Sequence, residues 1–122
     1  MILFAVVFGV VTMSAQNEID RMVENYSSTG RSTFTSAVER NPRTRKIVKV
    51  VKVLSTSDPG ARRFVSVFRR LARSGSSTET RKNGRLTMTL ATSSARSNRI
   101  YMLQTGTGNH TSVKVTIIIK VK

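Results

Sequence analysis

The chain has 122 residues, enough for one domain. It carries 21 Lys and Arg against 6 Asp and Glu, a formal net charge of +15, and such a surface attracts polyanions. It has no cysteine, which excludes disulfides, thiolate metal sites and a lipid-modified N-terminal cysteine.

An uncharged apolar segment occupies residues 2–13. It is shorter than the ~20 residues of a membrane-spanning helix and lacks the alternation of a half-buried strand. The small residues Ser14 and Ala15 follow it, as at a signal-peptide cleavage site, although Met13 is large for its position and the usual positive start is missing. We predict a signal peptide over residues 1–15, one mature domain over 16–122, and a periplasmic or secreted protein. The alternative is a cytoplasmic protein that buries the segment as a core strand.

A short helix is expected next. Asn17 can cap it, and four apolar residues follow at i, i+3, i+4 and i+7, namely Ile19, Met22, Val23 and Tyr26. Residues 32–39 are rich in strand formers, and residues 40–45 form a turn around Pro42. Residues 46–54 predict a second strand. Its lysines recur at every third position, which favours a bulge or an edge strand.

The strongest helix signal starts at Asp58, a good capping residue, followed by Pro59, which suits the first helical position. Gly75 can end this helix. Its apolar face consists of Ala61, Phe64, Val65, Phe68, Leu71 and Ala72. The opposite face carries Arg62, Arg63, Arg69, Arg70 and Arg73, with no acid among them.

The last third of the chain reads as strands. The Asn83-Gly84 pair predicts a hairpin between strands at 78–82 and 86–92, and further strands are expected at 98–105 and 113–121. Short turns make consecutive strands antiparallel, and two helices with one apolar face each can cover one side of the sheet. The sequence therefore predicts an α+β two-layer sandwich, with about five to six antiparallel strands and two helices on one face. The expected order is α-β-β-α-β-β-β, with room for one more short strand.

Four stretches carry a family resemblance: the apolar start ending in Ser-Ala-Gln, Asn17–Arg21, Arg40–Lys46 and Val115–Lys120. With these the chain resembles small exported proteins of Bacteroidetes that are filed as a domain of unknown function. The resemblance implies export and an α+β fold, and it implies no activity.

The sequence offers little for catalysis. His110 is the single histidine and falls in a predicted turn, so neither a catalytic triad nor a metal site can be assembled around it. Glu39 and Glu79 could meet across the sheet as an acid/base pair, but among so many arginines they are expected to be salt-bridge partners. No loop has the pattern that cradles phosphates. We predict no enzyme activity and no cofactor.

Two basic zones are candidates for binding an anionic surface, an acidic glycan or an acidic protein. One is the 31–52 segment with Arg43, Arg45, Lys46, Lys49 and Lys52, and the other is the second helix with Arg62, Arg63, Arg69, Arg70 and Arg73. A solvated face that keeps the protein soluble is the alternative. Nucleic acid is disfavoured, because only Tyr101 is expected on the open sheet face as a base-stacking aromatic. The expected function is a non-enzymatic binding domain of the cell envelope; the alternative is a cytoplasmic nucleic-acid-binding protein.

Overall fold

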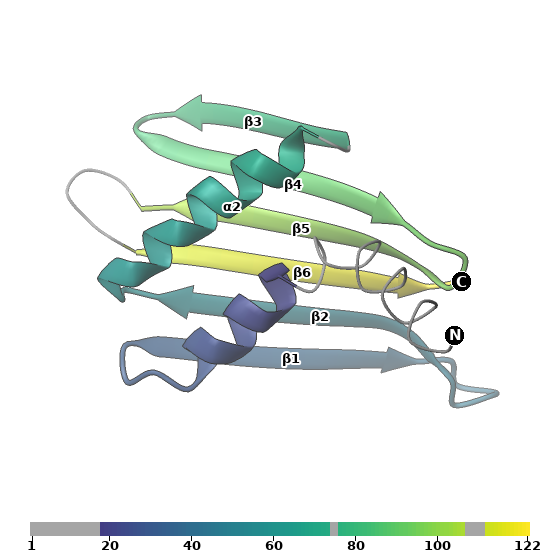
Figure 1. Cartoon of the computed structure of the whole chain (residues 1–122). Coiled ribbons are helices and arrows are strands. Elements are labelled where there is room, and N and C mark those ends of the chain that lie inside the picture. Colours follow the sequence, from purple (N-terminus) through teal and green to yellow (C-terminus); the bar gives the residue numbers. More distant parts are fainter. Residues whose placement is uncertain (1–17, 74–75, 107–111) are drawn as a thin grey trace, which may run out of the picture.

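The structure is a computed structural model that describes residues 18–73, 76–106 and 112–122 (Figure 1). The predicted signal peptide (1–15), the Asn17 cap, the Gly75 terminator and His110 lie outside these residues. A helix over residues 18–27 comes first. It is followed by β1 (Ser32–Arg40), β2 (Ile47–Thr56), the short 3-10 helix η1 (Pro59–Arg62), α2 (Arg63–Ala72), β3 (Ser76–Lys82), β4 (Arg85–Ser93), β5 (Ser97–Thr105) and β6 (Val113–Val121).

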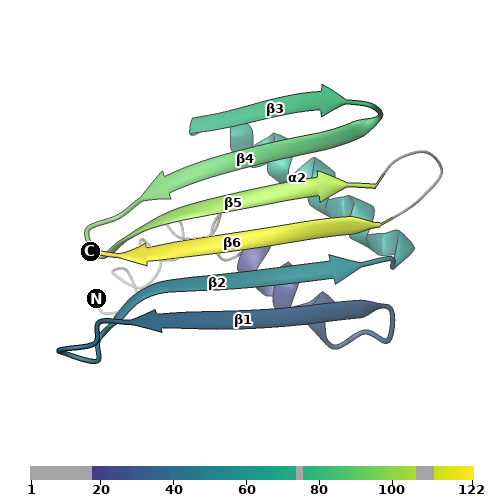
Figure 2. The same ribbon diagram turned by 180° about the vertical axis from the view of Figure 1, so that it is seen from behind.

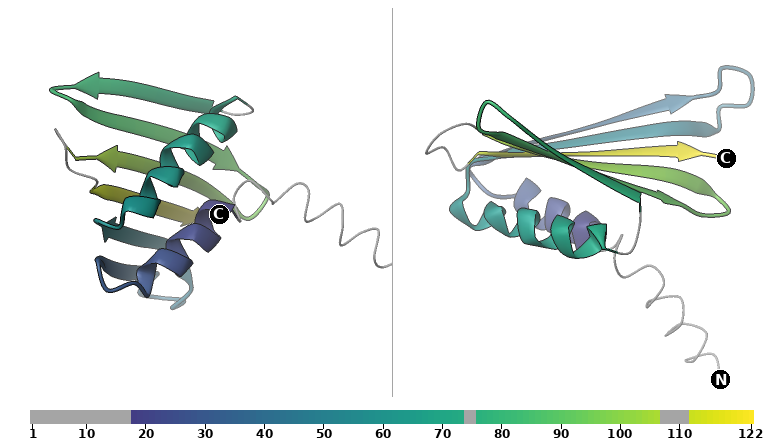
Figure 3. Two further views of the ribbon diagram at one scale, coloured as in Figure 1. Left: turned by 60° about the vertical axis from the view of Figure 1, so that its left-hand side comes forward. Right: turned by 90° about the horizontal axis from the view of Figure 1, so that it is seen from above.

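The six strands form one antiparallel sheet in the order β1-β2-β6-β5-β4-β3. The helix of residues 18–27 and α2 both lie on one face of this sheet (Figure 3), and none of the described helices lies on the other face (Figure 2). The predicted α+β sandwich is confirmed, with a sixth strand present. Of the two alternatives for the second strand, the edge position is wrong, because β2 is paired on both sides, with β1 and with β6. The β1–β2 register does shift between Glu39 and Arg40, as the bulge alternative expected.

Local sequence explains two of the hairpin turns, β3–β4 and β1–β2. Asn83 and Gly84 have φ angles of 55° and 78°, which are the left-handed conformations of the hairpin turn that Asn-Gly favours. In the β1–β2 turn the Asn41 side-chain oxygen accepts hydrogen bonds from the backbone N–H groups of Arg43 and Thr44, at 2.8 and 3.2 Å. Arg45 completes that turn with a φ of 60°.

The start of the second helix follows the predicted capping. The Asp58 carboxylate accepts a hydrogen bond from the Gly60 backbone N–H at 2.9 Å, and Pro59 opens the 3-10 turn that leads into α2. Phe64 and Phe68 are fully buried, and Val67, which was not assigned to the apolar face, is buried as well. Leu71 packs only partly against the core.

The core lies between the two helices and the covered face of the sheet. Strand alternation brings Leu54, Leu103, Val115 and Ile117 to this face, where they are buried under the helices. Tyr101 shares the face with them and is 1% exposed. The predicted position of Tyr101 on the open face is therefore wrong. Residues 100–103 are all apolar, so the phase of this strand could not be read from the sequence.

Candidate functional site

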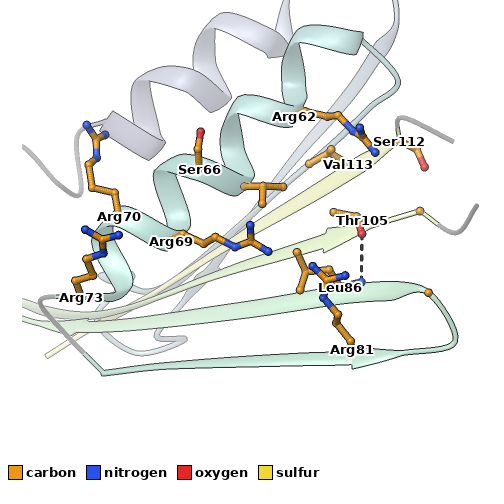
Figure 4. A pocket seen from close by; sticks show the side chains of 13 residues that line it. Arg62, Ser66, Arg69, Arg70, Arg73, Arg81, Leu86, Thr105, Ser112 and Val113 are labelled. Carbon is orange, nitrogen blue, oxygen red and sulfur yellow. Dashed lines mark hydrogen bonds between the residues drawn. The ribbon is translucent and has the colours of Figure 1, made fainter. Parts of the chain in front are cut away.

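A cleft of about 770 Å³ separates α2 from the β3–β4 hairpin and from the facing ends of β5 and β6 (Figure 4). Helical spacing directs Arg62, Ser66 and Arg69 along one flank of the helix, because positions three, four and seven apart share a side. Arg81 lies on the opposite wall. Residues of β3 alternate between the faces of the sheet, and Arg81 pairs with the buried Leu86.

The cleft has a cationic rim and an apolar floor. Figure 4 shows Arg62, Arg69 and Arg81 extending into the space between helix and strands, with Leu86 and Val113 beside them. Leu86 and Val113 are almost fully buried. Hydroxyl groups of Ser66, Thr105 and Ser112 complete the lining, and the Thr105 hydroxyl accepts a hydrogen bond from the Leu86 backbone N–H at 3.2 Å.

Two of the helix arginines have acidic partners that come from other elements. Arg69 Nε lies 3.6 Å from Oε1 of Glu79 in β3, and Arg70 forms an ion pair with Glu18 of the first helix. Both pairs are about half exposed, so each contributes only ~0–1 kcal/mol. Arg62, Arg73 and Arg81 have no carboxylate partner among the residues that the structure describes.

The predicted binding residues do not form a single site. Arg62, Arg69, Arg70 and Arg73 line the cleft, with Arg70 and Arg73 at the C-terminal end of α2, whereas Arg63 is not part of the lining. The β1–β2 turn, which carries Arg43, Arg45 and Lys46, lies at the far end of the sheet from the start of α2 (Figure 1).

The two predicted strand lysines lie on opposite faces of the sheet, and neither of them lines the cleft. Strand alternation places Lys49 on the open face, while Lys52 on the helix side lines a different cavity.

Arg81 was not among the predicted residues. The sequence did hold a signal for it: the alternation of β3 puts residues 77, 79 and 81 on one face once the phase of the hairpin is known. Which residues of β3 face the helices follows from the Asn83-Gly84 turn together with the buried Leu86 and Met88, because residues paired across the hairpin share a face.

A second cavity, of about 400 Å³, lies beneath the helix of residues 18–27. Here Arg99 donates hydrogen bonds to Asp20 at 3.0 Å and to the Tyr101 hydroxyl at 3.4 Å, and Lys52 is also in the lining. Burial raises the pKa of the Asp20 carboxyl above its usual value, although Arg99 and Lys52 oppose the shift. Oδ1 of Asp20 is buried and has no hydrogen-bond partner among the described residues. Burial likewise raises the pKa of Tyr101.

The acid/base pair and the metal cluster that acidic residues could supply are both absent from the described residues. Glu39 and Glu79 lie on opposite edge strands, and register places them on opposite faces of the sheet, so the acid/base pair considered from the sequence does not form. No group of three His, Asp or Glu residues suited to a metal ion occurs within the described ranges.

The helices of the described residues are too short and too polar to cross a bilayer. Comparisons of the chain with protein-family models, with curated proteins and with solved structures give no match.

Proposed function

We propose that this protein is a non-catalytic binding domain whose arginine-lined cleft takes an organic anion. The main support is that guanidinium groups from separate elements border one cleft (Figure 4). Arg62 and Arg69 come from the helical segment, and Arg81 comes from β3. Guanidinium groups donate paired hydrogen bonds to phosphate, sulfate and carboxylate, which makes such a rim suited to anions.

The floor of the cleft supports an organic ligand over a bare inorganic ion. Leu86, Val113 and Val65 offer apolar contacts below the charged rim. A volume of about 770 Å³ is in the range of small-molecule sites, ~300–1,000 Å³. A ligand with an anionic head and an apolar body matches both the rim and the floor.

The place of action is part of the proposal. The apolar segment before Ala15 supports export to the periplasm or beyond, where lipid head groups, acidic glycans and acidic proteins supply anionic groups. The nucleic-acid alternative has less support, because Tyr101, the aromatic expected to stack on bases, is buried under the helices.

Isothermal titration with phenyl phosphate and with inorganic phosphate tests the cleft. We expect phenyl phosphate to bind more tightly than inorganic phosphate, because its ring removes apolar surface from water. The Arg62→Gln, Arg69→Gln, Arg81→Gln triple variant should weaken phenyl phosphate binding at least ~10-fold. Raising the salt concentration from ~0.05 to ~0.2 M should also weaken it, because salt screens exposed charges.

The matched control removes the same charge from the β1–β2 turn, with Arg43→Gln, Arg45→Gln and Lys46→Gln. These residues are exposed and lie far from the cleft. The affinity of the control variant for phenyl phosphate should fall by less than ~3-fold, as expected when only long-range electrostatic attraction is reduced. Equal losses in the two triple variants would mean that only diffuse positive charge attracts anions, and the cleft would then have no role as a site.

A further inference from the structure

Figure 2 shows the face of the sheet that is turned away from the helices. The strand register places an apolar row on this face, and the row crosses five strands. Strand pairing aligns its members in register from β1 to β4: Ala37, Val51, Ile118, Ile100 and Ala91. In the next row Val53 and Met102 stand at the centre, among threonines. We call the central residues of these two rows, Val51, Val53, Ile118, Ile100, Met102 and Ala91, the open-face band.

Polar rows bound the open-face band on both sides. On one side Lys49 is paired with Lys120, followed by Asn98 of β5. On the other side Lys114 stands between Ser55 and Gln104. The apolar surface is therefore a strip two residue rows wide and does not extend over the whole face.

The dimensions of the strip select the shape of its occupant. Two rows on one face are ~7 Å apart, and five strands at ~4.8 Å spacing span ~19 Å. A second sheet packed face to face would cover the lysine rows as well as the strip. A single α-helix presents an apolar stripe of this width, and about 13 residues at 1.5 Å each cover the length.

The charge beside the strip selects the chemistry of its occupant. Lys49 and Lys120 are direct cross-strand neighbours, an arrangement that is destabilising for like charges. Glu39, across from Lys49, is the one acid that alternation places on this face among the described strands, and no ion pair joins it to a lysine there. A second copy of the chain would set lysine rows against lysine rows. An acidic partner relieves the repulsion instead.

From these observations we infer that the open-face band is a docking surface for an acidic amphipathic helix of a partner protein, laid across the strands. Leu or similar side chains of the helix would contact the band, and Glu or Asp on both flanks would meet Lys49, Lys120 and Lys114.

The experiment uses a synthetic 18-residue peptide with Leu at i, i+3, i+4 and i+7 and Glu on both flanks, and a scrambled peptide of the same composition. Binding of each labelled peptide to the full chain is followed by fluorescence anisotropy. The helical peptide should bind at least ~10-fold more tightly than the scrambled one, because only the helix can match the apolar strip.

Substitutions at the exposed Ala91 locate the contact without disturbing the core. Ala91→Glu should weaken helical-peptide binding by ~5-fold or more, whereas Ala91→Lys should leave it equal or tighter; a purely steric effect would weaken both alike. The cleft triple variant should bind the helical peptide within ~3-fold of the parent, which separates this surface from the arginine-lined cleft.

Three results would overturn the inference. The first is equal binding of helical and scrambled peptides. The second is concentration-dependent self-association that Ala91→Glu changes, which would indicate a second copy of the chain as the occupant. The third is binding to phosphatidylglycerol vesicles that depends on Ala91 while the peptides do not bind, which would indicate a lipid surface.

Discussion

Arg99 of β5 donates a hydrogen bond to Asp20 of the first helix, with Nη1 3.0 Å from Oδ2, across 79 positions of the sequence. This contact joins the helix of residues 18–27 to the sheet beside the buried Ile19 and Val23. One carboxylate oxygen thus has a hydrogen-bond partner, while Oδ1 of the same group is buried and has none within the described part of the chain. Burial is the largest influence on this carboxyl, and its pKa is raised.

The raised pKa of Asp20 predicts a pH effect of defined sign. The folded state holds the proton more tightly than the unfolded state, so the stabilisation from Asp20 is present below the unfolded pKa near 3.8 and is lost as pH rises through the folded value. Asp20→Asn keeps an acceptor for Arg99 and removes this titration. Its free energy of unfolding should rise relative to the parent as pH increases from 3.8 through the folded pKa, then stay level. Urea unfolding at pH 3 to 8 measures it, and a pH-independent difference would contradict the prediction.

We predict that a cavity at Phe68, in the core beneath α2, lowers the stability of the fold substantially. It is fully buried against the sheet, so Phe68→Ala should destabilise the fold by ~3–5 kcal/mol, through lost burial and the cavity left behind. Phe34→Ala is the control, because Phe34 is 39% exposed on β1 and should cost ~1 kcal/mol or less. Thermal and urea unfolding measure both variants. Equal losses of unfolding free energy in the two variants would contradict a central position of Phe68 in the core.

We predict that removing the charge of Glu79 increases the affinity of the cleft for anions. Its carboxylate lies beside Arg69 and competes with any anion for that guanidinium, and exposed pairs of this kind contribute ~0.2–1 kcal/mol. Glu79→Gln should therefore tighten phenyl phosphate binding by ~2- to 5-fold. Glu39→Gln changes the net charge equally at the opposite edge of the sheet and on its other face. If both variants bind equally well, the gain comes from net charge and not from the release of Arg69.

We predict that a side chain at Gly84, in the β3–β4 turn, lowers stability through backbone strain. Gly84 has a φ of 78°, and a Cβ added there meets nothing within 4 Å. Gly84→Ala should therefore destabilise by ~1 kcal/mol through backbone strain alone. Gly30→Ala also enters open space, at a residue without positive φ, and should be neutral or slightly stabilising. Denaturant midpoints compare the two, and equal changes would exclude strain at Gly84 as the cause.

Local signals were sufficient for much of the fold. The Asn83-Gly84 turn, the Asp58 cap and the alternation of β6 each act within a few residues, so strands, helices and fold class could be predicted from them. The strand order could not, because insertion of β6 between β2 and β5 depends on contacts across most of the chain.

The candidate site was predictable only in part, for the same reason. Helical spacing identified Arg62 and Arg69, since both lie on one element. Arg81 joins them from β3 only through the tertiary fold, and Glu18 and Glu79 reach the helix arginines from other elements. The face of Tyr101 was misassigned because both phases of β5 are apolar.

The place of β6 in the sheet has a consequence for how the chain folds during synthesis. β1 and β2 can pair early, and β3, β4 and β5 can pair with one another in sequence, but only β6 joins the two groups. Before Val113–Val121 has been synthesised, only two partial sheets can form, each with an unpaired inner edge. Assembly of the full sheet therefore has to wait for β6, and removal of β6 should leave two aggregation-prone partial sheets in place of a smaller stable domain.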